Sequence, residues 1–167
     1  MLGLLSYEDM FNYFKKARGK LVEALDKLPN EELNKSRGLS FDSIKDVFVH
    51  TVIVEDNWLH YRFAGLGAAT SRKFQDFTSM EDVKNYMEEV DAKTAELFRR
   101  ITNEDLRKTY KRTRPNGKEE VLSLEEVLYY MPFEIIYHYG EIFAEFWKMN
   151  VEAPYYSYLT YLKEKMD

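Results

Sequence analysis

Two side chains of types that bind metals, Glu134 and His138, stand four residues apart in the segment Met131–Ile142. Within a helix this spacing brings both side chains to one face. The same face carries apolar residues at helical spacing and is therefore predicted to pack against the protein interior: Val127, Met131, Ile135, Ile142 and Phe146. A polar pair in an apolar face requires a partner. That partner is either a metal ion or a set of hydrogen bonds, and the spacing leaves both alternatives open.

A third candidate ligand, His50, lies on another predicted helix, which begins at Ser43. Apolar residues follow at intervals of three or four and place His50 on the inward face: Val47, Val54, Trp58 and Tyr61. Two imidazoles and one carboxylate are sufficient for a divalent metal with an open coordination position. Zinc is the first choice, and nickel, iron or manganese accept similar ligands. His60 is about 80° around the helix from His50 and falls off this line.

The sequence excludes several other kinds of catalytic site. It contains no cysteine, which removes disulfides, thiolate metal sites and cysteine nucleophiles. It has neither a Gly-x-Ser-x-Gly elbow nor a glycine-rich phosphate loop. A di-iron carboxylate site needs two Glu-x-x-His motifs, and the chain has none. An enzymatic function would therefore depend on the metal.

Composition predicts one domain spanning residues 1–167, with 45% hydrophobic residues to form its core. The net charge of -5 is spread without a long single-sign block, which argues against a nucleic-acid partner. The basic segment Arg107–Lys118 is balanced by Glu119 and Glu120. No apolar run reaches the ~18 residues of a membrane span, and we expect a cytoplasmic protein. A single Gln with abundant Lys and Glu suggests the hypothesis of a thermostable protein.

Four long amphipathic segments predict an all-α fold, an antiparallel four-helix bundle in which facing helices can build a metal site. Serine caps mark the starts of three of these helices. Pro132 falls inside the last helix and predicts a bend just before Glu134. The expected helices are Tyr7–Leu28, Ser43 to Gly65, Met80–Ile101 and Ser123–Met149.

The connections between these helices carry weaker signals. Asn30–Gly38 is predicted to be a polar connection, and Ala68–Thr78 a loop whose two phenylalanines pack on the domain edge or wall a pocket. The turn sequence Pro115-Asn-Gly117 predicts a short hairpin or extended ribbon before the last long helix. The aromatic segment Tyr155–Leu162 predicts either a short helix that closes one end of the bundle or a dimer contact.

These motifs together resemble the DinB/YfiT-like superfamily of metal-dependent enzymes. The resemblance is carried by the run Ser43–His50 with Glu55 and Trp58, by Ile136–Ile142, and by Leu21–Leu33. It covers nearly the whole chain in order. It implies a four-helix bundle, often dimeric, with a divalent metal held by one histidine of the second helix and two histidines of the last long helix.

Carried over to this sequence, the resemblance makes His50 the first ligand and His138 the last, while Glu134 stands at the usual position of the middle histidine. It also implies a transferase, isomerase or hydrolase acting on a small molecule, a low-molecular-weight thiol as cofactor, and a homodimer. Three tyrosines lie near the ligands along their helices and either donate hydrogen bonds to a bound group or pack around the ligands: Tyr61, Tyr130 and Tyr137. The alternative is a metal-free helical bundle that serves as a binding or dimerisation module with a degenerate site.

Overall fold

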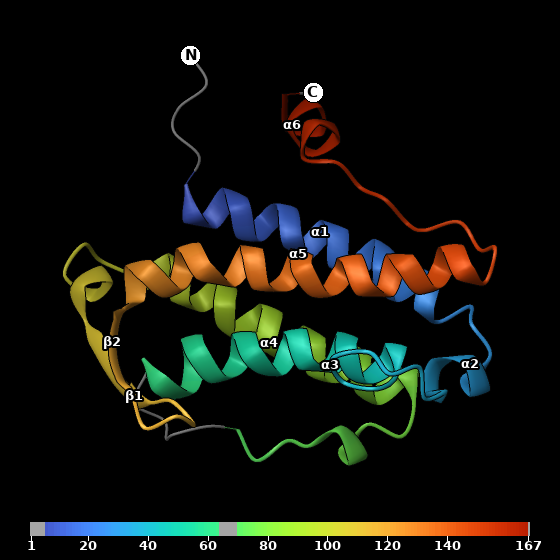
Figure 1. The fold of residues 1–167 in the computed structure, drawn as a ribbon. Coiled ribbons are helices and arrows are strands. Elements are labelled where there is room, and N and C mark those ends of the chain that lie inside the picture. Colours follow the sequence, from blue (N-terminus) through green and yellow to red (C-terminus); the bar gives the residue numbers. More distant parts are fainter. Residues whose placement is uncertain (1–5, 64–69, 167) are drawn as a thin grey trace.

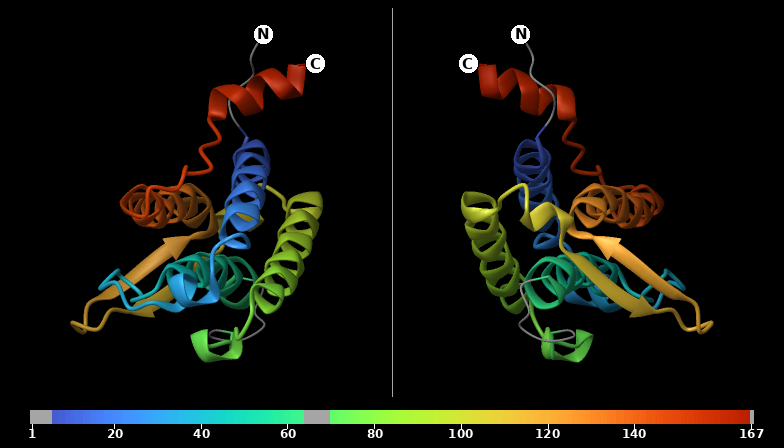
Figure 2. Two further views of the ribbon diagram at one scale, coloured as in Figure 1. Left: turned by 90° about the vertical axis from the view of Figure 1, so that its right-hand side faces the viewer. Right: turned by 90° about the vertical axis from the view of Figure 1, so that its left-hand side faces the viewer.

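The computed structural model describes residues 6–63 and 70–166, and these residues are mostly helical (Figure 1). Four long helices run side by side, and the end-on views in Figure 2 show them around a shared interior. They are α1 (Tyr7–Leu25), α3 (Ile44–Glu55), α4 (Met80–Arg100) and α5 (Leu124–Lys148). No helix in this described part is long and apolar enough to cross a membrane.

A serine side chain caps the N-terminus of each of these helices. Ser6, Ser43, Ser79 and Ser123 each accept a hydrogen bond from the backbone N–H three residues later. These contacts each satisfy a backbone donor left free at a helix start and confirm the three predicted caps, at Ser6, Ser43 and Ser123, while the cap at Ser79 was not predicted. At Ser123 the reciprocal bond from its backbone to the Glu126 carboxylate completes a capping box, so the start of α5 is defined by local sequence.

The predicted hairpin is confirmed as a two-stranded antiparallel sheet. Strand β1 (Thr109–Thr113) pairs with β2 (Glu119–Ser123), and Thr109 lies opposite Ser123. Gly117 takes the positive φ of 80° that the turn between the strands requires. A 3-10 turn, Asp105–Arg107, connects α4 to the hairpin, and β2 leads directly into α5.

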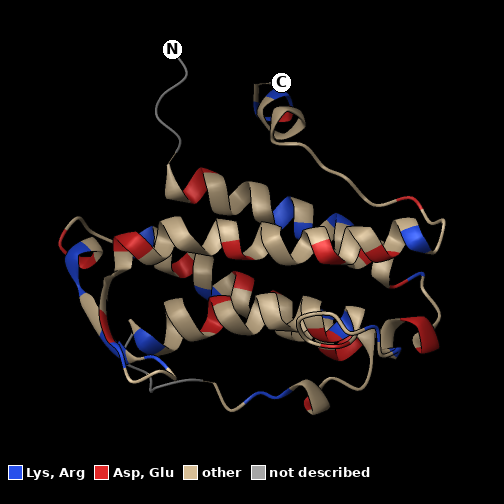
Figure 3. Cartoon of the chain, in the orientation of Figure 1, with Lys and Arg blue, Asp and Glu red and all other residues tan. Residues whose placement is uncertain are grey.

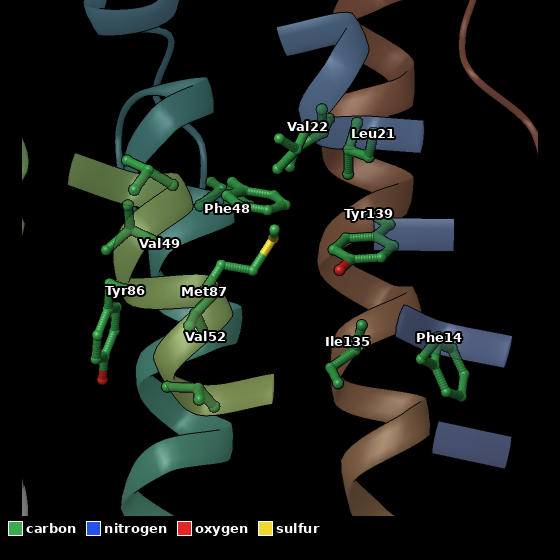
Figure 4. Packing of buried hydrophobic residues seen from close by; sticks show 14 of the residues in the cluster. Phe14, Leu21, Val22, Phe48, Val49, Val52, Tyr86, Met87, Ile135 and Tyr139 are labelled. Carbon is green, nitrogen blue, oxygen red and sulfur yellow. The ribbon is translucent and has the colours of Figure 1, made fainter. Parts of the chain in front are cut away.

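The interior is formed by the apolar faces of the four long helices, part of which Figure 4 shows at close range. The α5 stripe predicted to face inward is buried throughout, at Val127, Met131, Ile135, Ile142 and Phe146. In Figure 4, Ile135 and Tyr139 of α5 face Val52 and Phe48 of α3 across Met87. This burial holds α3 and α5 together along the faces that carry the candidate ligands.

Several elements differ from the sequence-based expectation. α1 ends at Leu25 rather than Leu28, and the expected polar connection contains a short helix, α2 (Asn30–Asn34). α3 continues as a π-helix over Asp56–Arg62, and its expected end at Gly65 lies outside the described residues. As expected, α5 continues through the buried Pro132 as one helix. The loop before α4 contains a 3-10 turn, Phe74–Asp76, followed by the buried Phe77.

The C-terminal helix α6 (Tyr158–Met166) does not close an end of the helix assembly. It lies across the outer face of α1, set off from the other long helices (Figures 1 and 2). Lys16 of α1 pairs with Glu164 of α6 at 2.9 Å, and the Tyr13 ring meets the rings of Tyr158 and Tyr161. The aromatic side chains of this segment therefore pack against α1.

Candidate metal centre

Three side chains of the types that bind metals converge between α3 and α5. Glu134 Oε1 lies 3.5 Å from His50 Nε2 and 3.3 Å from His138 Nε2. One ligand atom from each residue can be chosen so that all three lie within 4.8 Å of one another. His50 and Glu134 are 84 positions apart in the chain, and the packing of α3 on α5 brings them together. All three residues singled out from the sequence thus form one cluster.

His50 is positioned by the loop between α2 and α3. Gly38 and Asp42 take positive φ angles of 66° and 68°, and Asp42 accepts a 3.0 Å backbone hydrogen bond from Arg37. This tight turn brings Phe41 over the imidazole of His50, with the two ring centroids 3.7 Å apart and nearly parallel. The stacked ring restricts the rotation of His50 and covers one of its faces.

His138 is held at its other ring nitrogen. Its Nδ1 lies 3.3 Å from a Glu141 carboxylate oxygen and 3.3 Å from Ser40 Oγ. Ser40 donates a 2.6 Å hydrogen bond to the same Glu141 oxygen. Glu141 thereby favours a proton on Nδ1 of His138 and leaves the Nε2 lone pair directed at the cluster, as carboxylates beside metal-binding histidines do.

The electrostatic environment favours neutral His50 and ionised Glu134. Burial, followed by the neighbouring His138, lowers the pKa of His50 to about 4. Burial alone would raise the pKa of Glu134, but the polar side chains of Tyr130, His50 and His138 around it outweigh burial and lower that pKa. A neutral imidazole and a carboxylate are the protonation states that metal binding requires.

The donor set fits a divalent metal ion. Ligand bonds of about 2.0–2.2 Å around a tetrahedral ion place neighbouring donor atoms ~3.3 Å apart. The separations of 3.3 and 3.5 Å between Glu134 and the two histidines match this spacing. Two nitrogens and one oxygen also leave a position for water or substrate. Without an ion, His50 can donate from Nε2 to Glu134, and His138 can do so in its other tautomer, with the proton on Nε2 instead of on Nδ1 facing Glu141.

The three tyrosines expected near the site differ in position. Tyr130 lies one helical turn before Glu134, and burial, followed by the neighbouring Glu134 carboxylate, raises the pKa of Tyr130. Tyr137 presents its ring edge to His138 at a centroid distance of 5.5 Å and is 70% exposed. Tyr61 lies on the π-helix, where the ammonium group of Lys93 sits 5.8 Å from its ring. Tyr130 and Tyr137 thus flank the cluster, while the contact described for Tyr61 is to α4.

His60 belongs to a separate buried network. Its Nε2 lies 3.0 Å from Thr94 Oγ1, and Thr94 donates a 2.6 Å hydrogen bond to Glu55. Arg18 of α1 pairs with Glu55 at 2.8 Å and also with Asp91 of α4. This network links α1, α3 and α4, so His60 has a structural partner away from the candidate metal centre.

Sequence reasoning missed Ser40, Phe41 and Glu141 as parts of the site. Glu141 had a local signal, because it follows His138 by three residues and shares its helix face. Ser40 and Phe41 had no local sequence signal, because only the folded loop between α2 and α3 places Ser40 against His138 of α5 and Phe41 against His50 of α3. Phe74, expected on the domain edge or at a pocket, lies 5.6 Å from Phe41 and supports the ring that covers His50.

The chain matches a known protein-family model over most of its length. Residues 3–165, nearly the whole chain, match the model described as DinB family. A search of curated proteins gives no match.

Proposed function

Because this chain belongs to the DinB family, we propose that it is a metal-dependent enzyme that acts on a small molecule. The proposal takes α1, α3, α4 and α5 as the antiparallel four-helix bundle expected from the sequence. It assigns the divalent metal to His50, Glu134 and His138. The observation that carries it is the convergence of these three side chains from two helices.

The residues around the cluster hold the candidate ligand side chains in position, which supports a site that is formed before a metal binds. Phe41 fixes the plane of His50, and Glu141 with Ser40 fixes the tautomer of His138. Tyr130 lies one turn before Glu134 on α5, and its hydroxyl contributes to the lowered pKa of Glu134. A bound ion, with zinc as first choice and nickel, iron or manganese as alternatives, would supply Lewis-acid chemistry to a small substrate or a low-molecular-weight thiol.

The reaction class that suits this arrangement is transfer, isomerisation or hydrolysis on an electrophilic small molecule. Three protein ligands leave a coordination position for a substrate or a thiol. The Tyr137 hydroxyl, on an exposed side chain beside His138, could donate a hydrogen bond to a bound group. Glu134 in place of a third imidazole adds one negative charge, which changes metal preference and the electrophilicity of the ion.

A second candidate function is a metal-free binding or dimerisation module. The observation that favours it is the mutual hydrogen bonding of Glu134 with both histidines, which satisfies these groups without an ion. In this alternative the cluster stabilises the packing of α3 on α5.

Metal analysis of untagged protein separates the two functions. We expect about one divalent ion per chain, lost in His50→Ala and His138→Ala and retained in His60→Gln, whose histidine lies outside the cluster. Metal at ~100 times its dissociation constant adds ~2.7 kcal/mol to the free energy of unfolding, so a chelator should lower the melting temperature. Substoichiometric metal that does not change in His138→Ala would favour the metal-free module.

A further inference from the structure

Arg37, which is outside the candidate ligand set, lies at the base of the loop that covers His50. It belongs to the connection between α2 and α3, and its side chain is only 11% exposed. Its Nη1 lies 3.1 Å from a carboxylate oxygen of Glu145 on α5. Its Nη2 pairs with the Glu32 carboxylate of α2 and donates a 3.3 Å hydrogen bond to the Glu32 carbonyl. In Figure 3, the acidic α2 and the basic residues that follow it lie at the same end of the molecule as the last turns of α5. Arg37 therefore ties the base of the loop to two helices.

Arg37 and the tip of the loop are parts of one tight turn. The backbone N–H of Arg37 donates to the Asp42 carbonyl at 3.0 Å, and the N–H of Asp42 donates to the Leu39 carbonyl at 3.0 Å. Ser36 Oγ donates a 2.6 Å hydrogen bond to the Asp42 carboxylate. Gly38 takes a positive φ of 66°, a conformation that suits glycine, so the chain can reverse there. Because these bonds join the two ends of the turn, a movement of Arg37 also moves the residues at its tip.

The tip of this turn touches both candidate histidines. Phe41 stacks on the His50 ring with the centroids 3.7 Å apart, and it meets the His138 ring edge-on at 5.6 Å. Ser40 Oγ lies 3.3 Å from Nδ1 of His138. Since the two histidines lie on different helices, one turn that contacts both rings can orient them relative to each other.

Helix α5 carries the partners of the turn and two candidate ligands on one face. Glu134, His138, Glu141 and Glu145 follow one another at intervals of four, three and four residues, a spacing that keeps side chains on one helix face. Glu141 accepts the hydrogen bond from Ser40 at the tip of the turn, and Glu145 accepts the bond from Arg37 at its base. The turn is thus fixed at both ends to the helix whose ligands it covers.

We propose that Arg37 is a positioning residue for His50 and His138, which acts through the turn that it anchors. The inference rests on the proposed function and adds to the metal centre a residue that sets the orientation of its imidazoles. Removal of the guanidinium frees the base of the turn from both helices. It also leaves Lys148, at 2.5 Å, as the described partner of the buried Glu145 carboxylate.

The first test needs no metal. The sequence contains three histidines, so the imidazole signals of the chelator-treated, full-length protein can be assigned in a carbon–proton NMR spectrum with His60→Gln and His138→Ala. An aromatic ring stacked at 3.7 Å moves the signals of the imidazole beneath it upfield, and Phe41→Leu should remove this shift of His50. We expect Arg37→Met to remove it as well, and Arg37→Lys to keep part of it. The His60 signals should not change, because His60 lies in a separate network.

Two further variants separate positioning from a general loss of stability. Lys93→Met also breaks an ion pair to a buried carboxylate, that of Asp56, and should leave the His50 signals unchanged. The double variant Arg37→Met/Glu145→Met leaves neither charge of the pair buried alone, so we expect it to fold even if Arg37→Met does not. It should lose the upfield shift as well. An unchanged shift of His50 in the folded variants that lack Arg37 overturns the proposal.

The second test measures metal binding, with cobalt as the probe and its absorption spectrum as the readout. We expect Arg37→Met to weaken cobalt binding by about 10-fold or more and to change the spectrum, because groups that orient ligands contribute this much to affinity. Arg37→Lys should lose less, and Lys93→Met should match the wild type. Wild-type affinity and spectrum in Arg37→Met contradict the positioning role. A wild type that binds no cobalt refutes the proposed function, and the metal-free spectra then decide by themselves whether Arg37 positions the two histidines.

Discussion

Glu141 is the residue that most directly controls the character of His138 as a ligand. It lies within 3.3 Å of Nδ1 and shares a hydrogen bond with Ser40, so both its position and its charge act on the imidazole. Glu134, by contrast, is a candidate ligand in its own right. The two carboxylates of α5 therefore have different roles although each contacts the same histidine.

We expect Glu141→Ala to weaken metal binding by roughly 10–100-fold, because His138 loses the group that orients it. Glu141→Gln should lose less, since an amide oxygen still accepts a hydrogen bond from Nδ1. Competition with a chromogenic chelator measures both affinities. Glu88→Ala, at an exposed position of α4, removes the same charge away from the site and should leave the affinity unchanged. Equal affinity in Glu141→Ala and Glu88→Ala would contradict the role of Glu141.

At the scale of elements, the helix formed by α3 and the π-helix serves two polar clusters. His50 reaches the candidate metal centre, and Glu55 with His60 reaches the network of Arg18, Asp91 and Thr94. Buried charged groups are costly unless they are paired, so this network specifies how α1, α3 and α4 are placed. π-helical turns are rare and often occur at functional sites, and here the turn runs from the buried network to Arg62.

The buried His60 predicts an acid dependence of stability. Burial lowers its pKa below the ordinary value of 6.5, so below about pH 6.5 the unfolded chain binds a proton that the folded chain does not. Its contribution to stability is complete above pH 6.5 and is lost as the pH falls toward the lowered pKa. The loss is up to ~1.4 kcal/mol per pH unit.

Urea unfolding of chelator-treated protein at pH 7.5 and 5.5 measures this effect. His50, whose pKa of about 4 is also depressed, contributes a loss of the same sign. His60→Gln should therefore reduce the difference in unfolding free energy between the two pH values without abolishing it. A difference equal to that of the wild type would show that His60 is not held neutral by the fold.

At the scale of the whole molecule, the outer face of α5 exposes several large apolar side chains near the site. Its exposed residues recur at helical spacing, and Phe133 is 74% and Trp147 67% exposed: Tyr129, Phe133, Ile136, Tyr137 and Trp147. A groove lined by α1, α5 and the segment after α5 runs beside them. A large aromatic side chain covers ~150–250 Å², so this stripe approaches the ~800 Å² per partner of a stable interface.

The homodimer expected from the sequence stays a prediction, and we propose this α5 face for it. Sedimentation equilibrium at micromolar concentration should show a dimer that Phe133→Lys converts to monomer, because the charge would be buried in the interface. Val121→Lys, at a 60% exposed position of β2, should remain dimeric. A monomeric wild type would contradict both the dimer and the assigned face. The thermostability hypothesis likewise awaits a melting temperature.

Much of the architecture follows from local sequence. The serine caps, the three- and four-residue spacing of apolar side chains and the Pro-Asn-Gly turn predict where the long helices and the hairpin begin. These signals depend on residues within one turn of each other, so they can be recognised without the rest of the fold. The apolar face of α5 also predicted that His138 points into the protein, and its side chain is only 7% exposed.

The tertiary structure decided which distant residues come into contact. The convergence of His50 on Glu134, the stack of Phe41 on His50 and the pairing of Arg18 with Glu55 and Asp91 join segments far apart in the chain. Such contacts depend on how the apolar faces of several helices pack together, which helical periodicity does not encode. The sequence by itself therefore determined the helices and the residue types that could bind a metal. Packing alone brought a ligand atom of each of the three candidate ligands within 4.8 Å of the others.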